Sequence, residues 1–317
     1  NQRVNVQVNS KPLNGFYSFK LATNEDDVTG NWKVVANLGG MQFSKSVSVE
    51  TVKPNHLKME LNLADGEVRA INVRKNRSEA VLKGDFSTRW LHGAKASGLK
   101  ADIKLKMYSQ ATRFSSFTDY SFDDPVRVYS GRQKNLAEFK VDDEGAAKID
   151  IPFNISSLAP GKLKGSLTSR VFEPSGDFSV AKQSIDIHPY QSYVGLTMPK
   201  GDAARGMLLT DEEHKVDLVV VDTEGKPQMG SQKLDVSLFK LSWKWWWDSS
   251  ADNLANYTSR YSRKPLKQEM IEIKNGKGQW GFEVKHPDWG RYMVRVCDQK
   301  GYHCTGKIFY MDWPGWA

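Results

Sequence analysis

Two pairs of glycines constrain the fold of this chain more than any other feature of its sequence. Gly93 and Gly98 precede one strand-like run, and Gly225 and Gly230 precede another at the same offset (225 − 93 and 230 − 98 both give 132). Glycine accepts the positive φ that tight turns require and that other residues resist. The repeated turn predicts units of about 130 residues, the size of one domain.

The residues around these turns predict β-sheet. Apolar and polar residues alternate with a period of two in segments such as 16–21, 31–38, 99–108 and 234–247, with no long stretch of period 3.6. Gly39-Gly40 is expected to turn the chain into the next strand. We therefore expect an all-β protein made of tandem immunoglobulin- or fibronectin-III-like β-sandwich domains.

Two prolines, Pro54 and Pro189, mark the expected boundaries between domains. They predict one sandwich over residues 54–189 and a second over 190–317. A complete sandwich needs about 100 residues, so residues 1–53 are interpreted as the C-terminal part of a domain that begins upstream of residue 1.

Residues 109–135 are expected to form a long irregular excursion between two strands. The segment is rich in Ser, Thr and Asp, and four aromatic residues are expected to anchor it: Phe114, Phe117, Tyr120 and Phe122.

The chain has two cysteines, Cys297 and Cys304, on either side of Gln299-Lys300-Gly301. That sequence is typical of a hairpin turn, which brings the two cysteines near each other across the ladder. We expect a disulfide, which fits an exported protein, over the alternative of two reduced structural thiols.

The charge pattern and the apolar runs limit the partners. The formal net charge is +8, but lysines such as Lys100, Lys104 and Lys106 alternate with apolar residues, as on the solvated face of a strand. We therefore expect no nucleic-acid partner. No apolar run approaches the 18 or so residues that span a membrane.

The sequence predicts no catalytic, cofactor or metal site. The six histidines show no metal-ligand spacing such as H-x-x-x-H, and the acidic clusters fall at turns without EF-hand spacing. Residues 276–281 match G-x-G-x-x-G, but no helix follows, so a hairpin turn is expected there. A glycosidase pair of carboxylates stays open, because it is defined by distance in space.

The most unusual local feature is a run of four tryptophans. Trp243, Trp245, Trp246 and Trp247 could form an exposed aromatic contact surface for sugars. We favour the alternative that they pack into a core or against another domain, because tryptophan usually buries most of its area.

Several motifs resemble the macroglobulin-like domains of the alpha-2-macroglobulin family. They are the strand end and proline at 49–54, the glycine-paired turns at 90–98 and 222–230, and the closing G-x-Y strand at 290–296. The tryptophan run and the exit at 312–315 resemble the large bacterial members.

The resemblance implies an exported protein that traps proteases. In the family, cleavage of a bait segment is followed by capture through a thioester formed in a C-x-E-Q motif. Cys297-Asp298-Gln299-Lys300 departs from that motif. We therefore expect a scaffold segment that is not an enzyme and binds no cofactor.

The resemblance also implies where this scaffold lies and what it contacts. Its partners would be neighbouring macroglobulin-like, bait and thioester domains of the same chain, with target proteases bound through the full-length protein. The location would be the periplasm or cell surface of a Gram-negative bacterium, with an N-terminal lipid anchor upstream as one arrangement. The alternatives are a tandem β-sandwich adhesin or carbohydrate-binding protein, and a glycosidase or its accessory domain.

Overall fold

The computed structural model describes residues 6–23, 30–49, 55–75, 77–129, 131–156, 158–203, 205–241 and 265–313. The regular secondary structure in these residues is β-strand, apart from one 3₁₀ turn, η1 (Ser115–Phe117). The contact pattern separates residues 1–54 from residues 55–317, and the two units are described in turn. The predicted all-β fold class is confirmed.

The described part of residues 1–54 contains one antiparallel hairpin, made of β1 (Gly30–Leu38) and β2 (Met41–Val49). Gly39 and Gly40, both at positive φ, form its predicted turn. The strand expected over residues 16–21 is wrong, because the structure gives that segment only an isolated bridge between Leu13 and Phe16. In the described part of this unit, the segment pairs with neither β1 nor β2.

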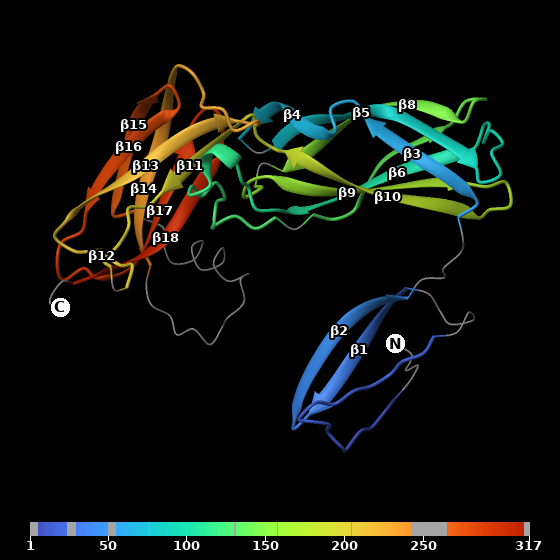
Figure 1. Cartoon of the computed structure of the whole chain (residues 1–317), viewed down its shortest axis with the longest axis horizontal. Helices are drawn as coiled ribbons and strands as arrows, with labels where there is room; N and C mark the ends of the chain where they lie inside the picture. Colours follow the sequence, from blue (N-terminus) through green and yellow to red (C-terminus); the bar gives the residue numbers. More distant parts are fainter. Residues whose placement is uncertain are drawn as a thin grey trace. The chain divides into compact units, whose positions relative to one another are not determined.

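Residues 55–317 begin with eight strands joined in one paired array (Figure 1). The strands are β3 (Leu57–Leu63), β4 (Glu67–Arg74), β5 (Arg77–Trp90), β6 (Lys100–Ser109), β7 (Lys134–Lys140), β8 (Ala146–Ser156), β9 (Leu163–Phe172) and β10 (Phe178–His188).

A second array follows, again with eight described strands (Figure 1). They are β11 (Ser192–Thr197), β12 (Leu208–Leu209), β13 (Glu213–Asp222), β14 (Ser231–Leu241), β15 (Lys267–Lys274), β16 (Lys277–Glu283), β17 (Gly290–Asp298) and β18 (Cys304–Asp312).

The two arrays share one pairing plan. In each, the first strand pairs with the third and the third with the sixth, which makes one layer: β3–β5–β8 and β11–β13–β16. In each, the fourth strand pairs with the fifth and the seventh, the seventh with the eighth, and the eighth runs parallel to the second. This plan is a β-sandwich written twice, and the limits 54–189 and 190–317 stay a proposal for its domains.

The glycine-paired turns repeat in three dimensions. Gly93, Gly98, Gly225 and Gly230 all have positive φ, between +67° and +94°. The N–H of Trp90 donates to Ala94 O at 3.0 Å, and its counterpart, the N–H of Asp222, donates to Lys226 O at 2.9 Å. The backbone conformation predicted from the glycines is confirmed.

The two turns nevertheless differ in their surroundings. A Cβ added to Gly93 would meet nothing within 4 Å, whereas one added to Gly225 would lie 2.7 Å from Phe114 Cδ1. Gly225→Ala should therefore reduce the free energy of unfolding clearly more than Gly93→Ala, which carries only the positive-φ penalty of about 1 kcal/mol. Urea denaturation of both variants measures this, and equal losses would contradict the contact.

Each sandwich has its own core between its layers. In the first, Ile103 and Leu105 of β6 pack with Phe86 of β5, and Leu167 adds to them from β9. In the second, Val216 and Val220 of β13 pack with Val236 and Val294. The burial pattern of strand β13 changes along its length. Residues 218–221 are all buried, and Val219 and Val221 belong to the first core. Both faces of this part of β13 are therefore covered.

Candidate functional site

The segment that covers this part of β13 connects β6 to β7. It is called the crossing segment, and its described residues are 110–129 and 131–133. It leaves the first sandwich and hydrogen-bonds to the second. The N–H of Ser121 donates to Leu196 O at 2.8 Å, and the N–H of Leu196 donates to Ser121 O at 3.0 Å. Ser121 thus extends the layer of β11 by one bridge.

The crossing segment also pairs with the other layer. The N–H of Gly306 in β18 donates to Asp123 O at 3.2 Å, and the Thr305 hydroxyl donates to Ser121 O at 2.8 Å. Strands β11 and β18 contact each other but share no pairing register. The segment therefore closes the seam between the β11 and β18 edges, because it bonds to both.

Aromatic rings fix the crossing segment in place. Phe114 and Phe122 are buried with their ring centroids 4.8 Å apart, and Tyr193 lies 5.6 Å from Phe114. A Cβ on Gly195 would lie 2.4 Å from Phe122 Cε1, so only glycine lets the ring approach β11 this closely. The predicted excursion and its aromatic anchors are confirmed for these two residues, whereas Phe117 and Tyr120 are half-buried.

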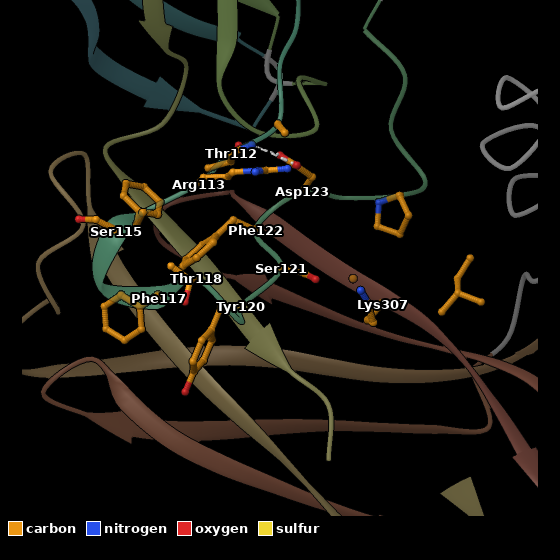
Figure 2. A pocket seen from close by; sticks show the side chains of 15 residues that line it. Thr112, Arg113, Ser115, Phe117, Thr118, Tyr120, Ser121, Phe122, Asp123 and Lys307 are labelled. Carbon is orange, nitrogen blue, oxygen red and sulfur yellow. Dashed lines mark hydrogen bonds between the residues drawn. The ribbon is translucent and has the colours of Figure 1, made fainter. Parts of the chain in front are cut away.

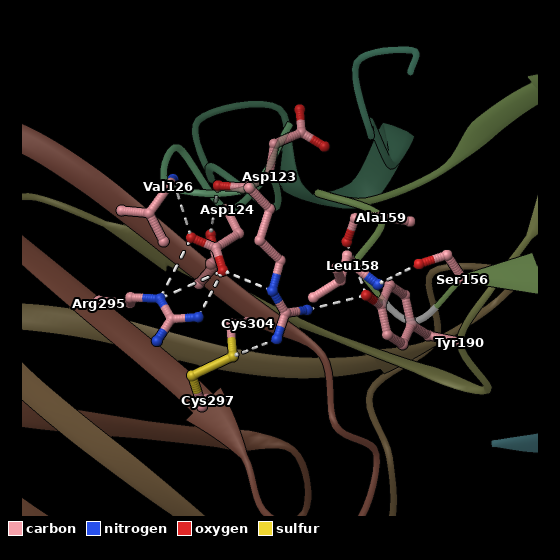
Figure 3. Close-up of polar contacts among 12 residues, drawn as sticks. Asp123, Asp124, Val126, Ser156, Leu158, Ala159, Tyr190, Arg295, Cys297 and Cys304 are labelled. Carbon is pink, nitrogen blue, oxygen red and sulfur yellow. Dashed lines mark hydrogen bonds and ion pairs between the residues drawn. A yellow bond between two sulfur atoms is a disulfide. The ribbon is translucent and has the colours of Figure 1, made fainter. Parts of the chain in front are cut away.

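A charged network lies beside these rings (Figure 3). The Asp124 carboxylate has no exposed surface and accepts from Arg295 Nη2 at 2.7 Å, while Arg127 Nε lies 3.2 Å away. Arg127 donates to the Tyr190 hydroxyl at 2.9 Å, and that hydroxyl donates to Ala159 O at 2.6 Å. One buried carboxylate thus links both sandwiches, since Arg295 belongs to β17 and Arg127 to the crossing segment.

Two buried histidines complete this interface. His303 Nδ1 accepts from the N–H of Val194 at 2.9 Å, and burial lowers the pKa of His303 to about 3. His188 Nδ1 lies 3.2 Å from the Tyr193 hydroxyl, and burial, reinforced by Lys162, lowers the pKa of His188 to about 4. Both imidazoles are therefore neutral at pH 7.

A groove of about 780 Å³, the junction groove, opens between the crossing segment and β18 (Figure 2). Phe117, Tyr120 and Arg113 line it from the crossing segment, and Lys307 lines it from β18. Burial raises the pKa of the Asp123 carboxyl in this groove, and the N–H of Thr112 opposes that shift by donating to the carboxylate at 3.1 Å.

The structure places one predicted pair of site residues at this interface. Cys297 and Cys304 face each other across β17 and β18, with their Sγ atoms bonded at 2.12 Å. Arg127 Nη2 lies 3.6 Å from Cys304 Sγ, so the pair borders the Asp124 network. The predicted hairpin between the cysteines is present, and their oxidation in the protein stays a prediction.

Reduction of the disulfide between Cys297 and Cys304 should lower the free energy of unfolding. The disulfide closes a loop of eight residues, for which the loss of chain entropy corresponds to about 2–3 kcal/mol. We expect reductant to lower the free energy of unfolding of the wild-type chain by that amount. Reductant should not change the free energy of unfolding of the double variant Cys297→Ala/Cys304→Ala, which has no disulfide to reduce. Two free thiols in the unreduced, unfolded protein would contradict the disulfide.

The other predicted site lies outside the described residues. Trp243, Trp245, Trp246 and Trp247 follow the end of β14 at Leu241, so the aromatic contact surface stays a prediction. A glycan array with wild type and Trp245→Ala tests it, and absence of binding to any glycan removes that alternative.

Sequence reasoning missed Asp124, Arg127, Arg295 and the two buried histidines. It interpreted Asp123-Asp124 as acidic residues at a turn. A usable signal was the continuous apolar run at 218–221, which departs from the alternation of a strand with one solvated face.

The described residues hold little that suggests catalysis. They contain no group of three or more His, Cys, Asp or Glu side chains placed to hold a metal ion. The described residues also contain no helix with the length and apolar character needed to cross a membrane. The arrangement as a whole is an interlocked joint between two sandwiches.

Comparisons with known proteins agree with this architecture. Residues 59–185 match the family model described as the bacterial alpha-2-macroglobulin MG5 domain, and residues 195–313 match bacterial macroglobulin domain 6. The chain belongs to the bacterial alpha-2-macroglobulin family. The two macroglobulin domains coincide with the two paired arrays, and the resemblance seen in the sequence is confirmed.

Two comparisons with Escherichia coli alpha-2-macroglobulin, one of sequence and one of structure, illustrate the match. The alpha-2-macroglobulin of Escherichia coli strain K12 is 23% identical over 304 residues, which cover 90% of this chain and 17% of that protein. The crystal structure of trypsin-activated alpha-2-macroglobulin from Escherichia coli has a TM-score of 0.50 and 16% identity, covering 90% of this chain and 19% of that chain. The second comparison supports the macroglobulin fold alone.

Proposed function

We propose that this chain is a framework segment of an exported bacterial inhibitor of endopeptidases, and that its two sandwiches move as one body. The observation that carries the framework role is the crossing segment, which hydrogen-bonds to both layers of the second sandwich. A joint held by backbone bonds, buried rings and a buried carboxylate resists bending more than a flexible linker does.

The inhibitory role is supported by the family. The relative from Escherichia coli is an alpha-2-macroglobulin, and its crystal structure is of a form activated by trypsin. The chain spans 17% of the length of that relative, so the chemistry of trapping would belong to other parts of a longer protein. In this proposal the chain is not an enzyme, and it contacts neighbouring macroglobulin-like, bait and thioester domains.

The disulfide supports export, because such bonds persist in oxidising compartments. We place the protein in the periplasm or at the cell surface of a Gram-negative bacterium. Fractionation of cells tests this part, since a cytoplasmic protein with two free thiols would contradict it.

A digestion assay with two substrates tests the inhibitory role. Trypsin is incubated with this chain, or with the longer protein that contains it, and cleavage of casein and of a small chromogenic ester is measured. We expect the longer protein to slow casein cleavage while sparing the small ester, and this chain alone to change neither.

Two outcomes would contradict the proposal. Stoichiometric inhibition by this chain alone would place an inhibitory site within it and remove the framework role. A longer protein that leaves casein cleavage unchanged across a panel of endopeptidases would remove the inhibitory role.

A further inference from the structure

Strand β18 has an open edge beside the junction groove. The N–H of Gly306 points outward, because it donates to Asp123 O, and Asp312 O points the same way, because it accepts from Thr210. Outward-pointing backbone groups recur every second residue of a strand. The N–H and C=O of Ile308 therefore point outward as well.

The edge is covered on both sides of Ile308 and open at Ile308 itself. The crossing segment covers Gly306, and β12 pairs with Met311 and Asp312. Within the part of the chain that the structure describes, the outward N–H and C=O of Ile308 have no protein partner. A single extended segment can bond to both groups, as added strands do at sheet edges.

The groove beside this edge is basic. Lys307 and Arg113 are exposed and line it from opposite sides (Figure 2). Neither has a carboxylate at ion-pair distance among the described residues. The Asp123 carboxylate lies in the same groove, and the charge of Arg113 is among the influences that oppose the rise in its pKa, so Asp123 offsets part of this positive charge. One carboxylate against two cations leaves the groove with net positive charge.

The half-buried rings of Phe117 and Tyr120 add apolar surface to the same groove. Their centroids are 5.3 Å apart in an edge-to-face arrangement. Such rings offer contact area to alternate side chains of an extended peptide, while the backbone bonds to the strand edge.

We propose that the junction groove binds an extended acidic segment of another protein, which adds as a short strand to β18 at Ile308. Its carboxylates pair with Lys307 and Arg113. A second copy of this chain is a poor occupant, because the chain carries a net charge of +8 and like charges repel. The proposal does not depend on the inhibitory role.

A peptide binding assay on the whole chain tests this proposal. The probe is a capped octapeptide in which Glu alternates with Thr and Val, and its counterpart has Lys in place of Glu. We expect only the acidic peptide to bind and to slow hydrogen exchange at the Ile308 amide. N-methylation of the peptide residue opposite Ile308 should abolish binding, because it removes the strand bonds.

Two charge-reversal variants test whether the charge of Lys307 contributes to binding of the acidic peptide. Lys307→Glu should weaken binding of the acidic peptide about tenfold or more, the effect of turning one ion pair into a repulsion. Lys148→Glu, at an exposed lysine of β8, should leave it unchanged. Circular dichroism confirms that both variants are folded.

Several results would overturn the proposal. Equal binding of the lysine peptide, the N-methylated peptide or an oligothymidine of the same length would show that no acidic strand is recognised. Unchanged exchange at Ile308 with saturating acidic peptide would place binding elsewhere. Concentration-dependent dimers with a protected Ile308 amide would assign the edge to a second copy.

Discussion

Asp124→Asn should lower the free energy of unfolding of residues 55–317 by about 3–5 kcal/mol. The substitution keeps the shape of the side chain but removes the charge of a carboxylate that has no exposed surface and faces the mostly buried side chains of Arg295 and Arg127. Removing one partner of a buried ion pair leaves the remaining charges without compensation. The loss of stability is therefore larger than the net contribution of the intact pair. Urea denaturation followed by fluorescence and by circular dichroism measures the loss.

The same experiment reports on the joint. Because Asp124 links the two sandwiches, its variant should also separate their unfolding into two transitions, which the two probes resolve. Asp186→Asn is the matched control: Asp186 pairs with Lys164 at 2.7 Å, but both side chains are a third or more exposed. The control should cost less than 1 kcal/mol. Similar losses for the two variants would contradict the role given to Asp124.

Lowering the pH should reduce the free energy of unfolding already at pH values well above those at which carboxylates titrate. His188 and His303 have pKa values lowered to about 4 and about 3 in the folded state, mainly by burial, against 6.5 when exposed. The unfolded chain therefore binds more protons than the folded chain below pH 6.5. The contribution of these two histidines to the free energy of unfolding is fully present above pH 6.5. Toward pH 4 it should fall by about 1.4 kcal/mol per pH unit for each histidine.

Urea denaturation at pH 7, 6 and 5 measures this slope. His303→Gln should remove about half of it, because one of the two buried imidazoles is lost. His92→Gln, at an exposed histidine of the first glycine-paired turn, should leave it unchanged. A slope that persists in full after replacement of both buried histidines would assign the acid sensitivity to other groups. The raised pKa of Asp123 acts in the opposite direction, since its protonated form is favoured in the folded state.

The sequence predicts local structure best where a single residue or a single turn determines the backbone conformation. The glycine pairs follow from which residues accept positive φ. The turn expected over residues 276–281 is wrong in its bounds, because Lys277–Glu283 form β16 and the turn lies at Asn275-Gly276. The turn between the two cysteines is present, but Tyr302 has the positive φ there. The buried face of β6 likewise follows from alternation, with Ile103, Leu105 and Met107 inside and Lys106 outside. These features depend on neighbours in the chain.

The predictions fail where the deciding partner is distant in sequence. Residues 16–21 alternate like a strand, but alternation forms a strand only where another strand supplies hydrogen bonds. Asp124 looks like a turn residue, because nothing nearby in sequence shows that Arg295, 171 residues away, will meet it in a buried site. The histidines are similar, since burial that lowers their pKa comes from the packing of both sandwiches.

The sequence by itself determined the β-sandwich plan, its repetition and its macroglobulin resemblance, because period, glycine turns and motifs are local and recur along the chain. Only the tertiary structure decided that the crossing segment enters the seam of the second sandwich and that a buried carboxylate joins the two. The physical reason is that the free energy of such contacts depends on desolvation and on partners brought together by folding, and neither is encoded in residue spacing.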